Sequence, residues 1–144
     1  MQIRRYFSMR ITYVCHMSAT LKYDYVRSTP QWRKTGARYD CVIFNGLNGL
    51  EFASILALFT LRMSTTDLRV ALIRRYHSVG RHSSSDYIQL QDVNQIDFIF
   101  ADSIVRAVHI LPPSTYNPFL TVQDLSSPDI HLCLQEHCQP ELPT

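Results

Sequence analysis

The chain lacks any run of apolar residues long enough to cross a membrane. The apolar stretch at residues 50–61 is about a dozen residues long and contains Glu51, whereas a spanning helix needs about 20 residues. The N-terminus has no continuous apolar segment either, because Arg4, Arg5 and Arg10 interrupt it. We therefore expect no membrane partner and no secretory signal, and we expect the four cysteines to be reduced thiols.

The sequence also lacks the motifs that organise a catalytic centre. Ser103 follows Asp102, and His109 comes six residues later, but no Gly-x-Ser-x-Gly elbow accompanies them. Asp40, Asp102 and Asp124 could form a carboxylate set for metal-assisted phosphoryl transfer, but that chemistry needs a larger mixed α/β frame than this chain offers. We predict that the protein is not an enzyme and has neither a cofactor nor a small-molecule substrate.

A structural zinc site is not predicted, because its usual ligand spacing is missing. Zinc sites are typically built from two separated ligand pairs such as Cys-x2-Cys. The C-terminal ligand types are too irregularly spaced to form such pairs, and their only distant partners would be Cys15 and His16. The weak metal candidates are His131, Cys133, His137 and Cys138.

Acidic residues are scarce in the first part of the chain. Residues 1–38 contain eight Lys or Arg and one acid, Asp24, whereas residues 39–144 contain six Arg and eleven acids. The first segment therefore carries a net charge of +7 and the second a net charge of −5. One hypothesis is that the basic segment binds a nucleic-acid backbone, and the alternative is that its charges pair with the acidic body. The candidate nucleic-acid-binding residues are Arg4, Arg5, Arg10, Lys22, Arg27, Trp32, Arg33, Lys34 and Arg38.

Short apolar or β-branched segments separated by turn residues predict a mainly β protein. The expected strands are Met9–Cys15, Tyr39–Phe44, Leu50–Met63, Leu68–Tyr76, Tyr87–Leu90, Ile104–Leu111, Phe119–Val122 and Ile130–Leu134. Ile104–Leu111 has apolar residues on both faces, which predicts a central position in a sheet.

Turns and loops are expected between these strands. The segment 45–49 contains Asn48-Gly49 and predicts a hairpin turn rather than a nucleic-acid-clamping GxxG loop. Residues 64–67 predict a second turn, and residues 101–103 predict a bend. Thr20–Ala37 is predicted to be an extended basic connector and Ser78–Asp86 a polar loop.

Residues 50–63 are ambiguous between a strand and a helix. As a strand, alternate positions from Ala53 to Met63 place only apolar side chains on one face. Leu and Ala outnumber β-branched residues in this segment, which favours a helix. The flanking turns favour the strand, which we predict, and an α+β fold is the alternative.

The expected architecture is a small, partly open β-barrel of the SH3 or bromo-adjacent-homology type. It comprises residues 39–134, with residues 1–38 as a basic strand and connector and residues 135–144 as a flexible tail. No internal repeat or extended low-complexity tract is present.

The block from Arg27 to Phe44 carries a family resemblance. It contains RSTPQWR at residues 27–33 and RYDCVIF at residues 38–44. This block, together with MRITYV at residues 9–14 and IDFIFADSIVRAVHILP at residues 96–112, resembles the C-terminal region of fungal transposase-like proteins of the Plavaka and KDZ type.

The resemblance implies an accessory module of a mobile-element protein. Such a module would contact DNA, chromatin or other transposase domains in the nucleus, with the cytoplasm as the alternative location. Two other hypotheses stay open, namely a reader module that binds histone tails through its acidic body and a mobile-element relic without selected activity. A reader would need an aromatic cage, and the candidates for it are Trp32, Tyr39, Tyr76 and Tyr87.

Overall fold

The computed structural model describes residues 1–15, 18–34, 36–81 and 88–123. These residues form a mainly β structure, as predicted, with one short 3₁₀ turn. No helix among the described residues has the length and apolar character needed to cross a membrane. The elements are β1 (Gln2–Tyr6), β2 (Ser8–Val14), β3 (Leu21–Thr29), β4 (Arg38–Tyr39), β5 (Cys41–Gly46), β6 (Gly49–Met63), β7 (Thr66–Arg81), β8 (Ile88–Phe100), η1 (Ala101–Ser103), β9 (Ile104–Leu111) and β10 (Leu120–Gln123).

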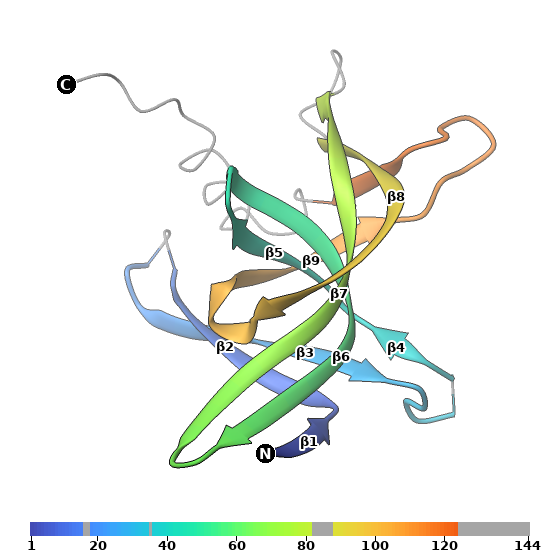
Figure 1. The fold of residues 1–144 in the computed structure, drawn as a ribbon. Coiled ribbons are helices and arrows are strands. Elements are labelled where there is room, and N and C mark those ends of the chain that lie inside the picture. The colour runs from blue at the N-terminus through green and yellow to red at the C-terminus, as the bar shows by residue number, and fades with distance from the viewer. Residues whose placement is uncertain (16–17, 35, 82–87, 124–144) are drawn as a thin grey trace.

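The larger of two sheets curls into a ring. Its strand order is β1-β6-β5-β9-β10-β8-β7, and an additional pairing of β6 with β7 closes the ring (Figure 1). The smaller sheet has the order β2-β3-β4. Its two long strands pass behind β6 and β7 in Figure 1 and contact the ring sheet through β9 and β6.

β6 is the long strand around which the ring is organised. One edge of it pairs first with β5, at residues 50–54, and then with β1, at residues 58–62. The other edge pairs with β7 along almost its whole length. The strand predicted for residues 50–63 is therefore confirmed. Its hydrogen bonds to neighbouring strands on both edges outweigh the helix propensity of its Leu and Ala residues.

Tight turns at both ends of β6 set these registers. Gly46 pairs with Gly49 across the first turn, and Gly49 has a φ of 111°, a conformation that favours glycine. Met63 pairs with Thr66 across the second turn, where Ser64 has a φ of 57°. Both predicted turns are confirmed.

Other predicted elements are confirmed with small changes. β2 occupies the segment predicted as Met9–Cys15, and η1 forms the predicted bend. β9 lies between β5 and β10, in the predicted central position. The strand predicted at 39–44 is interrupted at Asp40. The strand predicted at 130–134 and the tail at 135–144 lie outside the described residues.

Two loop predictions and one strand length are wrong. Half of the connector predicted at 20–37 is a strand, because Leu21–Thr29 pairs with β2 in a hairpin. The polar loop predicted from Ser78 is a continuation of β7 as far as Arg81, and the short strand predicted at 87–90 extends to Phe100 as β8. These segments carry polar side chains at exposed positions, so their composition is typical of a loop. Pairing with neighbouring strands nevertheless keeps their backbone extended.

The core joins the basic segment to the rest of the chain. Met9, Ile11 and Val26 belong to the same buried cluster as Phe44 and Ile73. A second cluster packs β5, β6, β8, β9 and β10 together and contains Ile43, Phe52, Ile88, Leu90, Val108 and Val122. The core therefore crosses the boundary at residue 38 that the charge pattern suggests.

An ion pair fastens the small sheet to the ring. Arg106 on β9 donates from Nε to Asp24 Oδ2 on β3 at 2.9 Å, and the Ala107 N–H donates to the same oxygen at 3.0 Å. The side chains are 6% and 19% exposed. The Arg106 guanidinium also lies 3.5 Å from the ring centroid of Tyr13 on β2, so the contact involves both long strands of the small sheet.

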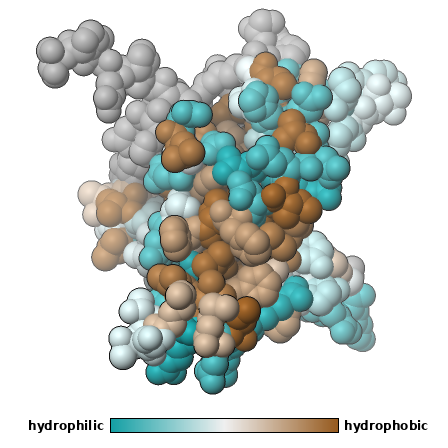
Figure 2. All heavy atoms as spheres, viewed as in Figure 1, coloured by the Kyte–Doolittle hydropathy of each residue, from teal (hydrophilic) through white to brown (hydrophobic). Residues whose placement is uncertain are grey.

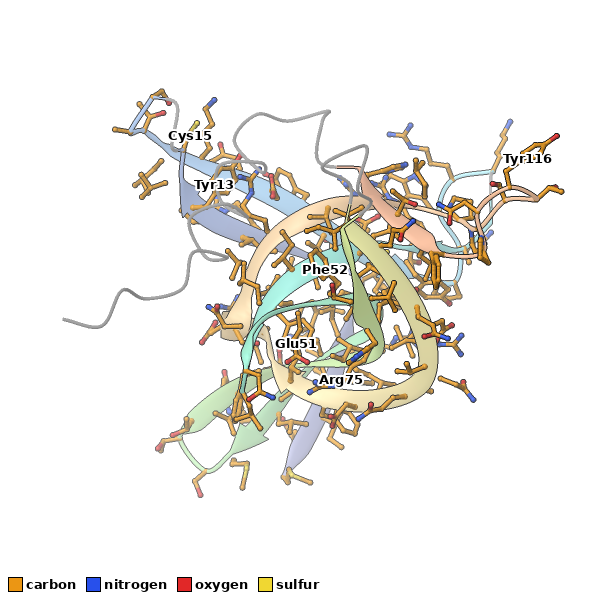
Figure 3. All side chains as sticks on the ribbon, turned by 90° about the horizontal axis from the view of Figure 1, so that it is seen from above. Tyr13, Cys15, Glu51, Phe52, Arg75 and Tyr116 are labelled. Atoms are coloured by element: carbon orange, nitrogen blue, oxygen red, sulfur yellow. The ribbon has the colours of Figure 1, made fainter. Side chains whose placement is uncertain are left out.

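A second charged group lies inside the ring. Arg75 on β7 contacts Glu51 Oε1 at 2.7 Å and Asp97 Oδ2 at 3.3 Å, and its guanidinium lies 5.5 Å from the Phe44 ring centroid. Figure 3 shows Glu51 and Arg75 pointing into the ring, while Tyr13 and Cys15 lie on the β2–β3 hairpin outside it. This group links β6, β7 and β8 across the ring interior.

Replacing Asp24 with alanine is expected to lower the free energy of unfolding by about 3 kcal/mol, because it breaks a largely buried ion pair. Urea unfolding monitored by circular dichroism measures this loss. Asp67→Ala is the control, because Asp67 makes only an exposed 3.9 Å pair with Arg62, and we expect a change below about 0.5 kcal/mol. Equal losses in the two variants would contradict the assigned role of Asp24.

Candidate nucleic-acid interface

One face of the small sheet carries alternating basic and aromatic side chains. Because side chains in a strand alternate between faces, Met9, Ile11 and Val26 point into the core. Their neighbours point outward, where Arg10 pairs in register with Tyr25. The outward side chains of the hairpin are Ser8, Arg10, Thr12 and Val14 on β2 and Leu21, Tyr23, Tyr25 and Arg27 on β3.

Arginine–ring contacts order this face. The Arg10 guanidinium lies 4.9 Å from the centroid of Tyr23, and that of Arg27 lies 5.7 Å from the centroid of Tyr25. The two tyrosine rings pack edge to face, with centroids 5.9 Å apart and planes at 83°. Each such cation–π contact contributes about 0.5–1 kcal/mol at an exposed site, which favours one arrangement of otherwise mobile side chains.

Trp32 is the centre of the densest part of the face. Three guanidinium groups, from Arg27, Arg33 and Arg38, lie 4.7, 5.1 and 5.0 Å from its ring centroid. The backbone N–H of Trp32 donates to the Gly36 carbonyl at 2.6 Å, which closes the loop that carries the ring. The term basic-aromatic face refers below to Arg10, Tyr23, Tyr25, Arg27, Trp32, Arg33 and Arg38.

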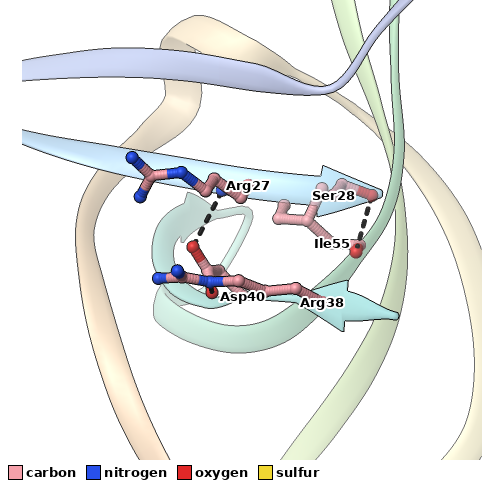
Figure 4. Close-up of polar contacts among 5 residues, drawn as sticks. All are labelled: Arg27, Ser28, Arg38, Asp40 and Ile55. Atoms are coloured by element: carbon pink, nitrogen blue, oxygen red, sulfur yellow. Dashed lines mark hydrogen bonds and ion pairs between the residues drawn. The ribbon is translucent and has the colours of Figure 1, made fainter. Parts of the chain in front are cut away.

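Asp40 contacts two arginines of this cluster. Its Oδ2 accepts a hydrogen bond from the backbone N–H of Arg27 at 2.8 Å, and its Oδ1 accepts one from Arg38 Nε at 3.0 Å. Ser28, which is fully buried, donates from Oγ to the Ile55 carbonyl at 3.1 Å and so anchors β3 to β6. Figure 4 shows both sets of contacts, which together hold the end of β3 and the short strand β4 against the ring.

The acids of the described residues leave most of this basic charge without an ion pair. Among the described residues, all seven Asp and Glu form ion pairs with arginine. Of the eight cations in residues 1–38, only Arg38 takes part in these pairs. The alternative that the basic segment pairs with the acidic body therefore holds only for Arg38 within the described chain, because the arginines of residues 39–123 neutralise the acids.

The structure brings together part of the predicted binding set. Arg10, Arg27, Arg33 and Arg38 share the basic-aromatic face, and Lys34 is exposed beside Arg33. The other predicted cations lie elsewhere: Arg4 and Arg5 are on β1 in the ring sheet, and Lys22 alternates to the opposite side of β3.

Sequence reasoning missed Tyr23 and Tyr25. The signal that could have identified them is the alternation of these two residues with Asp24 and Val26 along β3. Residues 20–37 were expected to form a connector, in which alternate side chains do not define the two faces of a sheet, so the alternation was not interpreted.

The described candidates for the aromatic cage do not line one common pocket. Tyr76 packs against the second core cluster and lines a small pocket with Leu90, Asp92 and Leu120. Neither Trp32 nor Tyr39 lines that pocket. Tyr87 lies outside the described residues.

The remaining sequence candidates have structural roles or lie outside the described part of the chain. Ser103 Oγ donates to the Phe100 carbonyl at 2.7 Å, and Asp102 forms an ion pair with Arg69 at 2.7 Å. Both contacts fit the bend predicted there. Among described residues, no group of three His, Cys, Asp or Glu could hold a metal ion. Outside the described chain lie Asp124 and the weak metal candidates His131, Cys133, His137 and Cys138, as well as His16.

Cys41 is a protonated thiol near neutral pH. Burial raises its pKa from 9.0 to about 11, partly offset by a hydrogen bond with Ser54 and reinforced by the charge of Asp40. The thiol packs against the second core cluster. Its environment therefore disfavours the thiolate form that nucleophilic chemistry requires.

A separate apolar surface covers the outside of β1, β6, β7 and β8. Cross-strand partners align Ile3 with Leu61 and Leu68 in one row, and they align Phe59 with Val70 and Phe100 in the next. These residues line a hollow of about 610 Å³. Figure 2 shows hydrophobic residues gathered over this part of the molecule, and exposed patches of this kind mark contacts with other molecules.

Comparison with family models, with curated proteins and with solved structures found no match. The resemblance to transposase-like proteins thus rests on the residues quoted for it.

The only tryptophan of the chain, Trp32, allows the electrostatics of this face to be measured directly. Because three guanidinium groups surround it, we expect iodide to quench its fluorescence at least about twice as efficiently as caesium, through local enrichment of anions. Neutralising Arg27 and Arg33 with glutamine should remove most of this difference, whereas Arg62→Gln with Arg69→Gln should not. Equal quenching of the wild type by both ions would contradict an anion-attracting site.

The Cys41 thiol is expected to make stability depend on alkaline pH. Because its pKa is higher in the folded chain, its contribution is complete below pH 9 and is lost as the pH rises toward about 11. Cys41→Ala should therefore lose about 2 kcal/mol less unfolding free energy than the wild type over this interval. Urea titrations at several pH values measure the difference, and identical pH profiles would show that Cys41 does not contribute.

Proposed function

We propose that this protein is a non-catalytic module that contacts DNA through its basic-aromatic face. The observation that supports this most directly is a set of arginines that form no ion pair within the described part of the chain and alternate with aromatic rings on one side of the small sheet. Cations without acidic partners keep their charge available for phosphate groups, and arginine matches phosphate with paired N–H donors.

The energetics are those of binding to the sugar-phosphate backbone of DNA. Three arginines on this face, Arg10, Arg27 and Arg33, form no ion pair among the described residues and can each neutralise one phosphate. Each contact with duplex DNA contributes about −0.9 to the slope of log affinity against log salt. Such binding carries little base specificity, because phosphate contacts position a protein without identifying sequence. The role is therefore attachment to DNA or chromatin rather than recognition of a defined site.

The wider role proposed here is the one that the family resemblance implies. The module would serve a transposase-like protein in the nucleus, with the cytoplasm as the alternative. The apolar surface over β1, β6, β7 and β8 supports a second contact with another folded domain, since soluble monomers rarely expose large apolar patches. The histone-reader and relic hypotheses stay open, but no contact among the described residues favours the reader over DNA.

Neutralising two arginines of the face is the direct test. Arg27→Gln with Arg33→Gln should weaken binding to a random-sequence duplex and make the salt slope shallower by nearly two, because two phosphate contacts are removed. Filter binding at several salt concentrations measures both quantities. The matched control is Arg62→Gln with Arg69→Gln, which removes the same charge from exposed pairs elsewhere.

The proposal has two clear ways to fail. One is an absence of binding by the wild-type protein even at low salt, and the other is an equal loss of affinity in the two double variants. The second result would mean that net charge, and not the basic-aromatic face, attracts the DNA.

A further inference from the structure

We infer that the basic-aromatic face accommodates single-stranded nucleic acid, with bases stacked on Tyr23, Tyr25 and Trp32 and phosphates held by the interleaved arginines. This inference rests on the proposed function and names the form of nucleic acid that the same site takes. The reason for the inference is the presence of exposed aromatic side chains on this face, because phosphate binding alone does not require them.

The rings are positioned to receive bases. Tyr23 and Tyr25 occupy alternate positions of one strand, so both stand on the outward face. They are 53% and 52% exposed. Trp32 follows beyond Arg27, which lies within 5.7 Å of the Tyr25 centroid and 4.7 Å of the Trp32 centroid. Ring and cation therefore succeed each other along the face, as base and phosphate succeed each other along a strand.

A duplex cannot use these rings. In double-stranded DNA the bases stack on one another and present only their edges in the grooves, so an exposed tyrosine meets sugar, phosphate or base edge. In a single strand the base faces are free, and stacking on aromatic side chains is the usual source of affinity for such substrates. Exposed tyrosines would thus add affinity for the single strand and little for the duplex.

The arginine contacts serve the same arrangement. Each guanidinium group lies over a ring, 4.7 to 5.7 Å from its centroid, so a base that stacks on that side displaces the guanidinium toward the neighbouring phosphate. The phosphates on either side of that base then meet these cations. Because every base has a stacking face, the site is expected to tolerate different sequences.

Two probes of equal length test the inference. Fluorescence anisotropy would compare a labelled oligothymidylate of about 12 nucleotides, a length suited to a single binding surface, with the corresponding duplex at the same low salt concentration. The wild type should bind the single strand more tightly. Tyr23→Leu with Tyr25→Leu should lose about tenfold or more of this affinity and less than about twofold of the duplex affinity.

The chain offers a matched control on another strand. Phe98 and Phe100 also alternate on one exposed face, are each 63% exposed, and make no arginine contact among the described residues. Phe98→Leu with Phe100→Leu should leave both affinities unchanged. Circular dichroism verifies the fold of each variant, and quenching of Trp32 emission by the oligothymidylate gives a second readout on the unaltered protein.

The outcomes separate this inference from the proposed function. Equal or tighter binding of the duplex by the wild type, or equal losses for both probes in the tyrosine variant, would overturn the single-strand site and leave DNA contact standing. Absence of salt-dependent binding to either probe would overturn both. An oligouridylate arm distinguishes RNA from DNA as the source of the strand, and tighter binding of either single strand than of duplex supports the inference.

Discussion

The Asp24–Arg106 ion pair is the contact on which the arrangement of the two sheets depends. It joins β3 to β9 through a largely buried carboxylate that also accepts the Ala107 N–H. Losing either charge would leave the other in a poorly solvated position. The pair therefore disfavours other orientations of the small sheet, and with Met9, Ile11 and Val26 it makes the basic segment part of the fold.

This attachment gives the basic-aromatic face its rigidity. The inward side chains of β2 and β3 pack in the core, so the outward ones are held at regular intervals. Asp40 and Ser28 extend the same effect to the Trp32 cluster, because they tie β4 and the end of β3 to each other and to β6. A flexible basic arm could also attract phosphate, but it would have to lose conformational freedom on binding.

The distribution of ion pairs explains why the charge of the first 38 residues matters. Arginines of the ring strands neutralise the acids of the ring, as Arg75 does for Glu51 and Asp97 and Arg74 does for Asp92. The ring therefore offers few free carboxylates to the basic face. The net charges of residues 1–38 and 39–144, +7 and −5, suggested that the two segments attract each other. The ion pairs show instead that the described acids pair almost entirely with arginines of residues 39–123.

The sequence by itself determined the β class, the hairpin turns around β6 and the central position of β9, because turn residues and β-branched runs act locally. It also identified the arginines and Trp32 as a candidate site. Only the tertiary structure decided that residues 21–29 form a strand, that Tyr23 and Tyr25 join the site, and that Arg4, Arg5 and Lys22 lie away from it. The reason is physical: strand pairing and the face on which a side chain emerges depend on partners far away along the chain, and composition does not encode them locally.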